Sequence, residues 1–235
     1  MRRPRYTAAQ FTVLLTAESC ALTAYNCWML ESHFVVRPAE TRDDEAIAGL
    51  VVEGFVDKFR PVFGRRMDRS VKIMEKWVSL EHSLGGVRSL VLEASGPADI
   101  AASVGIRTGG SDEDALARGL WKVLRGNLGF ARACWAATLL SYPRYAATSS
   151  EAYVERLVVT HEHRQRGMAR ALLDAAEAVA RESGKESVGL HVSGGNLPAL
   201  KLYEAYGYQE SSRQRSLLTG YFLGIREWLY LRKEL

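Results

Sequence analysis

The sequence has few cysteines, and their positions limit the sites that they can form. The three are Cys20, Cys27 and Cys134, among 235 residues. None belongs to a Cys-x-x-Cys pair and no Cys/His cluster has the spacing of zinc ligands, so we expect no metal site. A chain of this length buries a core without disulfides or metals. A Cys20–Cys27 disulfide would need an oxidising compartment, and the simpler expectation is a reducing cytoplasm.

Long apolar runs are also missing from the sequence. A membrane-spanning helix needs about 20 mainly apolar residues, but the apolar stretch 11–15 is short and Glu18 soon interrupts it. Three arginines precede this stretch, as basic residues do in signal and transit peptides. We expect residues 1–32 to be a leader outside the fold, and we expect no integral membrane span.

Charge of one sign is not in large excess. Lys and Arg number 31 and Asp and Glu 27, which gives a net charge of +4, and the basic residues form no long run. A solvated mixed surface is the ordinary explanation of such a balance, so we expect no nucleic-acid partner. The content of 47% hydrophobic and 25% charged residues is typical of a soluble globular protein. We expect one domain over residues 33–235.

The spacing of apolar residues predicts strands and helices in alternation from residue 33 onward. The expected strands are 33–37, 87–94, 100–107, 153–159, 187–192 and 227–232, with another near 214–218. The expected helices are 43–59, closed by Pro61 and Gly64, then 70–84, a helical stretch over 113–140, 167–183 and 198–206. This order predicts an α/β fold in which helices cover a mixed sheet.

The stretch Arg164-Gln165-Arg166-Gly167-Met168-Ala169 lies between a strong strand and a strong helix. A glycine at this place lets the backbone come close to a ligand. The free N–H groups and the positive end of the helix dipole point toward the loop, an arrangement that binds a pyrophosphate without a metal. Alone, the string is a weak signal, because a basic turn with a glycine is the equally good alternative.

A second motif extends from Asn196 to Tyr208, after the next expected strand. Its Asn, Ala, Leu-Tyr-Glu and Gly-Tyr elements keep a definite spacing. Pro198 suits the first helical turn, where its missing N–H has no partner to lose. Gly207 suits the end of the same helix.

The two motifs, in this order, resemble the GNAT (GCN5-related) N-acetyltransferases. The family has Arg/Gln-x-x-Gly-x-Gly/Ala after its fourth strand and Asn-x-x-Ala-x-x-Leu-Tyr-Glu-x-x-Gly-Phe/Tyr after its fifth. The specific part of the resemblance covers 153–208, about a quarter of the chain. The chain departs from the pattern at 160–163, which lacks the usual proline, and takes the alanine option at Ala169. The resemblance implies the GNAT acyl-CoA N-acyltransferase fold, with acetyl-CoA as co-substrate.

The resemblance also implies a cofactor site between the fourth and fifth strands, which splay apart around the pantetheine arm. Main-chain groups of the fourth strand would pair with the arm, backbone amides of the loop would hold the pyrophosphate, and the Asn196 side chain would bond the arm. The residues expected at this site are Leu157, Val158, Val159, Arg164, Gln165, Arg166, Gly167, Met168, Ala169, Arg170, Asn196, Ala199 and Tyr203.

By the same resemblance, Tyr203 would protonate the leaving thiolate of CoA, since a phenol of pKa about 10 suits a thiol of about 8.5. Its ordinary alternative is a core tyrosine. Glu155 is expected to be the base that deprotonates the amine, and the alternative is a strand glutamate that faces solvent or pairs with Arg156. His191 is the rival base, because histidine titrates near neutral pH.

The resemblance does not name the acceptor, which would be a small amine or a peptide or protein amine. The stretch Glu113–Leu140 is a helical insert before the fourth strand, as in an uncharacterised subfamily, and we expect it to cover the acceptor side. Its Trp121, Phe130, Trp135 and Leu139 could line an acceptor channel, form a homodimer face, contact a membrane surface peripherally or simply pack on the fold. The alternative function is a non-catalytic acyl-CoA-binding regulatory module.

Overall fold

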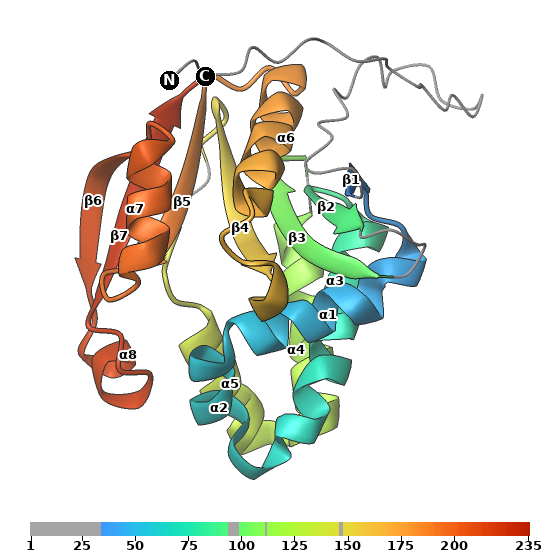
Figure 1. Cartoon of the computed structure of the whole chain (residues 1–235). Helices are drawn as coiled ribbons and strands as arrows, with labels where there is room; N and C mark the ends of the chain where they lie inside the picture. Colours follow the sequence, from blue (N-terminus) through green and yellow to red (C-terminus); the bar gives the residue numbers. More distant parts are fainter. Residues whose placement is uncertain (1–33, 94–98, 111, 146–147) are drawn as a thin grey trace, which may run out of the picture.

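A computed structural model describes residues 34–93, 99–110, 112–145 and 148–235 of the chain (Figure 1). The expected leader at residues 1–32 and the expected turn at Gly96-Pro97 lie outside the described residues. The described part is built around one mixed sheet with helices on both faces (Figure 1). The α/β fold predicted from the sequence is therefore confirmed.

The sheet has seven strands in the order β1-β2-β3-β4-β5-β7-β6. Their bounds are β1 Val35–Pro38, β2 Val87–Glu93, β3 Ile100–Arg107, β4 Glu151–Val159, β5 Ser187–Ser193, β6 Gln209–Arg215 and β7 Glu227–Glu234. Only β4 and β5 pair in parallel, and every other neighbouring pair is antiparallel. The one parallel pair lies at the centre of the sheet, where the two halves meet.

The helices divide between the two faces of the sheet. Their bounds are α1 Asp44–Gly54, α2 Val56–Phe63, α3 Ser70–Leu84, α4 Glu113–Leu128, α5 Phe130–Leu140, α6 Met168–Glu182, α7 Leu197–Ala205 and α8 Leu217–Phe222. Leu172 and Val179 of α6 belong to a fully buried core on one face, and Tyr203 of α7 joins it. Ile47 of α1 and Val78 of α3 form the core on the other face.

The insert between β3 and β4 forms two helices, α4 and α5, separated by Gly129 at φ 79°. Helix α4 packs on α3, where Gly119 lies so close to Leu80 that a Cβ would be 3.1 Å from its Cδ1 atom. Leu139 of α5 is 0% exposed and belongs to the same core as Ile47 of α1 and Val78 of α3. Most of the apolar surface of the insert is therefore used for packing, and Phe130 is the exception at 65% exposed.

Three boundaries differ from the sequence predictions. The first predicted helix is divided at Phe55. Pro61 lies inside α2 rather than after it, because the fixed φ of proline is compatible with a helix and only the hydrogen bond of its missing N–H is lost. The expected strand near 214–218 is wrong in its second half. The strand ends at Arg215, and the side chain of Ser216 then caps α8 by accepting from the N–H of Thr219 at 3.2 Å.

Candidate active site

The site begins where β4 and β5 separate. Their Cα partners extend from Glu151 opposite Ser187 to Val154 opposite Leu190. Beyond that point β4 continues to Val159 and β5 to Ser193. The edge of β4 that faces β5 therefore has no strand partner over residues 155–159, the part of β4 that holds Leu157, Val158 and Val159. Such an edge offers backbone groups that an extended ligand with amide bonds can pair with.

The loop after β4 presents a second set of backbone groups. Gln165 has φ 63° and Gly167 has φ 82°, and α6 begins at the next residue, Met168. Positive φ values in such close succession turn N–H groups toward one side, and the first N–H groups of a helix have no acceptor within it. Arg164 and Arg166 are exposed beside these groups. The loop therefore concentrates N–H donors and positive charge at the end of the unpaired edge.

Helix α7 brings Asn196 and Tyr203 to the same region. The Asn196 side chain accepts a hydrogen bond from the N–H of Ala199 at 3.3 Å, which caps the helix. Tyr203 is only 8% exposed and belongs to the core cluster that includes Val192, near the free end of β5. Burial raises the pKa of Tyr203 to about 12. Its hydroxyl therefore keeps its proton at neutral pH and is available as a hydrogen-bond donor.

Glu155 lies at an irregularity in β4. Between Gly105 and Ile106 of β3 the register shifts, so that Glu155 has no Cα partner there. A bulge of this kind redirects side chains. Oε1 of Glu155 accepts two N–H groups of Arg107, one of them at 2.7 Å, and Oε2 lies 3.6 Å from Nη1 of Arg156. Glu155 is thus held between two guanidinium groups.

The second guanidinium group continues this chain of charges into the core. Arg156 donates two hydrogen bonds to Glu81 of α3, at 2.9 and 2.5 Å. Burial alone would lower the pKa of Arg156, but the charge of Glu81, its hydrogen bonds and the charge of Glu155 together outweigh burial and raise the pKa above its ordinary value. The order Glu81, Arg156, Glu155, Arg107 alternates in sign, so each buried charge has an opposite neighbour.

His191 of β5 uses both of its ring nitrogens. Nδ1 lies 2.9 Å from the hydroxyl of Tyr153, and Nε2 lies 3.3 Å from the amide nitrogen of Gln214. Because that amide nitrogen can only donate, and also donates to the carbonyl oxygen of Arg144 at 2.7 Å, Nε2 is the acceptor and Nδ1 carries the proton. Burial lowers the pKa of His191 to about 4. The imidazole is therefore neutral at physiological pH.

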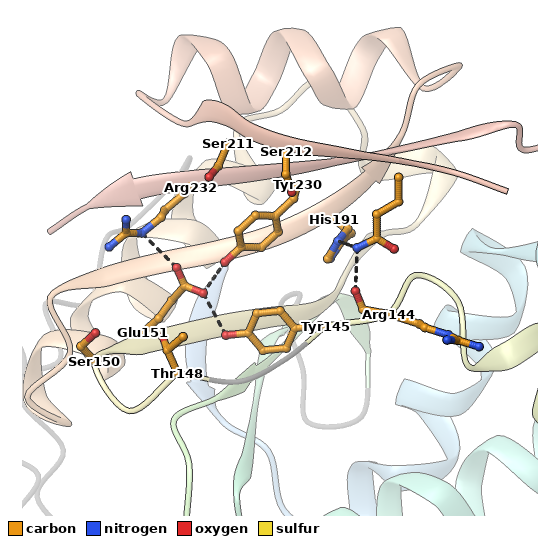
Figure 2. Close-up of a pocket in the computed structure, with 11 residues that line it drawn as sticks. Arg144, Tyr145, Thr148, Ser150, Glu151, His191, Ser211, Ser212, Tyr230 and Arg232 are labelled. Atoms are coloured by element: carbon orange, nitrogen blue, oxygen red, sulfur yellow. Dashed lines mark hydrogen bonds and ion pairs between the residues drawn. The ribbon is translucent and has the colours of Figure 1, made fainter.

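An open pocket of 390 Å³ lies beside His191 (Figure 2). The residues that line it are Arg144, Tyr145, Thr148, Ser150, Glu151, His191, Ser211, Ser212, Gln214, Tyr230 and Arg232. Glu151 accepts hydrogen bonds from the hydroxyls of Tyr145, at 2.9 Å, and of Tyr230, and it pairs with Arg232 at 3.0 Å. A Cβ at Gly189 would overlap the Tyr230 hydroxyl, so this arrangement depends on the glycine.

The sequence reasoning missed Lys58 of α2, which is partly buried. Its Nζ donates to the carbonyl oxygen of Tyr142 at 2.8 Å and lies 5.7 Å from the centre of the Trp228 ring. No carboxylate among the described residues lies within 4.0 Å of it. Burial lowers the pKa of Lys58 to about 8, although the charge of Glu155 opposes this. One signal was present, because Lys58 falls on the same helical face as Phe55, Phe59 and Val62.

Arg107, Tyr145, Glu151 and Tyr230 were also missed, and nothing in the sequence marked them. Each contributes one side chain from a different strand or loop, so only the folded chain brings them together. The two helices of the insert pack on neighbouring helices, α4 on α3 and α5 on α2, and the cover of the acceptor side by the insert stays a prediction. The segment that follows α5 also reaches the site, through Tyr142 and Tyr145.

In the described ranges, no group of three or more His, Cys, Asp or Glu side chains is arranged to hold a metal ion. No helix in the same ranges is long and apolar enough to cross a membrane.

Comparison with known sequences gives a family-model match and a curated relative. The family model "Acetyltransferase (GNAT) family" matches residues 126–208. A curated relative, GCN5-related N-acetyltransferase 4, chloroplastic, of Arabidopsis thaliana, is 40% identical over 58 residues. That match spans 25% of this chain and 20% of the relative, so the similarity covers only a fifth of the relative's length.

Solved structures extend the similarity to most of the chain. A crystal structure of an acetyltransferase matches with a TM-score of 0.60 and 21% identity, over 85% of this chain and 98% of that one. PaiA N-acetyltransferase from Thermoplasma acidophilum, solved with coenzyme A, matches with a TM-score of 0.55 and 11% identity, over 86% and 99% of the two chains. These structures establish the fold. The chain therefore shares the fold of these acetyltransferases over most of its length, and it is similar to the GNAT family over residues 126–208.

Proposed function

We propose that the protein transfers an acetyl group from acetyl-CoA to a primary amine. The observation that carries this proposal is the unpaired edge of β4 over residues 155–159, which leads directly to the loop Arg164–Ala169. A member of the GNAT superfamily with both features has a place for each part of the CoA molecule. PaiA N-acetyltransferase, which shares the fold, was solved with coenzyme A, and this supports the same cofactor here.

In this proposal acetyl-CoA lies along the open edge of β4. The main-chain groups of Leu157, Val158 and Val159 pair with the amides of the pantetheine arm, and the Asn196 side chain bonds the arm from the other side. The N–H groups from Gln165 to Arg170 bind the pyrophosphate, whose charge the exposed Arg164 and Arg166 neutralise. The thioester then lies near the point where the strands separate.

Tyr203 assists the departure of CoA. Because its pKa is raised to about 12, its hydroxyl is protonated throughout the working range and donates to the sulfur as negative charge develops there. A thiol of pKa about 8.5 is the stronger acid, so a complete transfer from the phenol is unfavourable by itself. Tyr203 therefore passes on the proton that the attacking nitrogen loses in the same step.

The reaction also needs a base that removes a proton from the acceptor amine. The sequence predicts Glu155, whose Oε1 already accepts two bonds from Arg107 while Oε2 faces Arg156. These contacts occupy the oxygen lone pairs through which Glu155 would accept a proton. His191, the rival, is neutral and has both nitrogens bonded. Glu155 stays in the proposal as the first base to test.

The acceptor amine would approach from the face of the sheet that carries the pocket in Figure 2. This pocket opens beside His191, next to the point where β4 and β5 separate. Its hydroxyl groups and the carboxylate of Glu151 suit a polar amine rather than an apolar one. Whether that amine is small or belongs to a peptide is decided by the experiment below.

The second function, a non-catalytic acyl-CoA-binding module, has one observation in its favour. Both bases predicted from the sequence are engaged, Glu155 by two arginines and His191 by Tyr153 and Gln214. A module that only senses the cofactor would need the β4 edge and the loop but no base. It would bind acetyl-CoA without releasing CoA in the presence of any amine.

The test measures binding first and turnover second. Titration calorimetry with acetyl-CoA should give a Kd between about 1 µM and 1 mM, the range usual for enzyme substrates. Release of free thiol should then be followed with spermidine, tyramine and an Ala-Lys dipeptide, which represent polyamines, small amines and peptides. The proposal fails without binding, and binding without thiol release from any of the three favours the module.

The place of action in the cell stays a prediction. The cysteine pattern predicts a cytoplasmic protein, whereas the name of the Arabidopsis thaliana relative places that protein in the chloroplast. Expression of the full chain with a fluorescent tag at its C-terminus, with and without residues 1–32, tests whether these residues direct it to an organelle.

A further inference from the structure

Acetyl transfer to an amine requires a group that accepts the proton of the ammonium ion. Neither Glu155 nor His191 is well suited to this, because hydrogen-bond and ion-pair partners already occupy the atoms that would accept the proton. Among the other titratable groups near the separation of β4 and β5, one lysine has no acidic partner. We propose that Lys58 is the base that takes the proton from the acceptor amine, an inference that rests on the proposed acetyl transfer.

The position of Lys58 is fixed by elements on both sides of the gap. One helical turn before it, Gly54 lies so close to Val158 of β4 that a Cβ there would be 2.6 Å from Cγ1 of Val158. Lys58 itself lies over Trp228 of β7, and Trp228 is the Cα partner of Ser193, the last residue of β5. The start of α2 therefore crosses from β4 to the strand beyond β5, on the face opposite α6.

Two contacts hold the amine in this place. The carbonyl oxygen of Tyr142 accepts a hydrogen bond from Nζ at 2.8 Å. The ring of Trp228 faces the amine and is itself fixed by a hydrogen bond from its Nε1 to the hydroxyl of Thr219 in α8, at 3.2 Å. Neither contact needs a positive charge on Nζ, because a neutral amine still donates to a carbonyl oxygen. The site therefore tolerates both protonation states of Lys58.

The surrounding charges leave Lys58 close to balance between its two forms. The desolvated amine has its pKa lowered to about 8, and Glu155 on β4 is the one charge that opposes this. Arg107 of β3 and Arg156 of β4 compensate Glu155, and Glu81 of α3 is in turn compensated by Arg156. On β7, Glu227 pairs with Arg213 and Arg215. Of the segments nearby, α8 contains no charged residue, Arg132 of α5 is exposed, and Arg144 is exposed beyond Tyr142.

The proton balance of the step is then complete. Neutral Lys58 takes one proton from the ammonium group of the acceptor and later returns it to solvent. The free lone pair attacks the carbonyl carbon, a C–N bond forms, and the C–S bond breaks with its electrons on sulfur. A second proton leaves the nitrogen and reaches the sulfur through the hydroxyl of Tyr203. The products are the N-acetylated amine, CoA as its thiol and one proton.

Two substitutions separate a base from a positive charge. Lys58→Met removes both, whereas Lys58→Arg keeps the charge but cannot lose its proton in the working pH range. Lys122→Met, on the exposed side of α4, is the matched control. The measurement is kcat from pH 6 to 10 with acetyl-CoA and whichever of spermidine, tyramine and Ala-Lys gives the fastest thiol release. Calorimetry with CoA reports whether each variant retains its folded cofactor site.

We expect kcat of the unmodified protein to rise with an inflection near pH 8. In both Lys58 variants the inflection disappears and kcat falls about 100-fold or more, as for loss of a general base. The Kd for CoA and the Lys122→Met profile stay unchanged. If Lys58→Arg restores kcat, or if Lys58→Met keeps the inflection, Lys58 is not the base.

A second measurement needs no acceptor. Labelling with trace acetic anhydride at several pH values, read by peptide mass spectrometry, gives the titration of Lys58 and of Lys122 in the same sample. We expect Lys58 to become reactive near pH 8, well below the ordinary value for a lysine of about 10.4. If Lys58 titrates at or above pH 10, the inference is refuted. If CoA still binds in that case, the proposed function stands. Absence of CoA binding refutes the proposed function and this inference with it.

Discussion

The two sides of the β4–β5 gap are built in different ways. The side that we propose for the cofactor is made of consecutive backbone, from the open edge of β4 through the loop to the first turn of α6. The side that we propose for the acceptor is made of single side chains from distant elements, such as Lys58 of α2, Arg107 of β3 and Glu155 of β4. A backbone site tolerates changes of side chain but not of dihedral angles, whereas a side-chain site has the opposite sensitivity.

The charges differ between the two sides as well. Arg164 and Arg166 on the cofactor side are exposed and lie on the loop itself. On the acceptor side the charges are buried and paired, with Glu81 at 1% and Arg156 at 9% exposed. An exposed basic loop suits an anion that arrives from solvent, while a buried paired network fixes geometry. Lys58 is the exception, because it has burial without an acidic partner.

The largest effect is expected for the backbone of the loop. Gly167→Val places a β-branched residue at φ 82°, which such residues rarely adopt, so the N–H groups around it must turn away. Binding of acetyl-CoA should become undetectable by calorimetry while the circular dichroism spectrum is retained. Gly126→Val in α4 is the control, since nothing lies within 4 Å of a Cβ there. Normal binding by Gly167→Val would show that the loop does not hold the pyrophosphate.

A smaller but still large effect is expected for the hydroxyl of Tyr203. Tyr203→Phe should lower kcat about 100-fold, the lower end of general-acid effects, because a phenol of pKa about 12 assists the thiolate mainly as a hydrogen-bond donor. The Kd for acetyl-CoA should not change. Tyr208→Phe, whose ring lies 5.9 Å from that of Tyr203, is the control and should keep its kcat. Equal kcat in both variants would assign Tyr203 to the core alone.

The difference between the two sides explains what the sequence could predict. The loop and helix α7 are continuous motifs, so their residues are recognisable from spacing and local conformation. Lys58, Arg107 and Glu155 lie about fifty residues apart in the chain. The register of β3 and β4 brings Arg107 and Glu155 together, and the packing of α1 and α2 on the sheet adds Lys58. The division of the first helix at Phe55 and the start of α8 at Ser216 depend on single caps and kinks, which apolar periodicity does not reveal.

A moderate effect on stability is expected for Glu155. Glu155→Gln removes the charge that Arg107 and Arg156 share, and it leaves Arg107 without its partly buried partner. The free energy of unfolding should fall by about 1–3 kcal/mol, as for a broken partly buried ion pair. The matched control is Glu113→Gln, because Glu113 also pairs with Arg107, at 3.3 Å, but its side chain is 66% exposed. An exposed pair of this kind contributes about 0–1 kcal/mol.

The same variant also compares the two candidate bases. If Glu155 is the base, Glu155→Gln should lose activity by about 100-fold or more while Lys58→Met stays active. If Lys58 is the base, the reverse holds, and the loss of kcat in Glu155→Gln should be small beside the loss of stability. Urea unfolding and thiol-release rates measured on the same protein samples separate these outcomes.

The smallest effect, and the most specific to Lys58, is the pH dependence of stability. Because the pKa of Lys58 is about 8 in the folded protein and about 10.5 in the unfolded chain, the unfolded chain binds more protons between these values. The buried charge therefore destabilises the fold fully below pH 8, and this penalty disappears as the pH rises to 10.5. Lys58→Met removes the penalty. The variant also loses the hydrogen bond to Tyr142, which changes the free energy of unfolding by the same amount at every pH. The part of the difference that varies with pH therefore reports the titration of Lys58.

For each pH, the free energy of unfolding of Lys58→Met is compared with that of the unmodified protein. We expect this difference to favour the variant by about 1–2 kcal/mol more at pH 7 than at pH 10. This value is reduced for the partial exposure of the amine. Urea unfolding at pH 7, 8, 9 and 10 measures the difference, and Lys122→Met should show none that changes with pH. A constant difference across this range would mean that Lys58 titrates like an exposed lysine. The acceptor side would then contain only charges that have opposite partners. It would differ from the cofactor side only by the buried series Glu81, Arg156, Glu155 and Arg107.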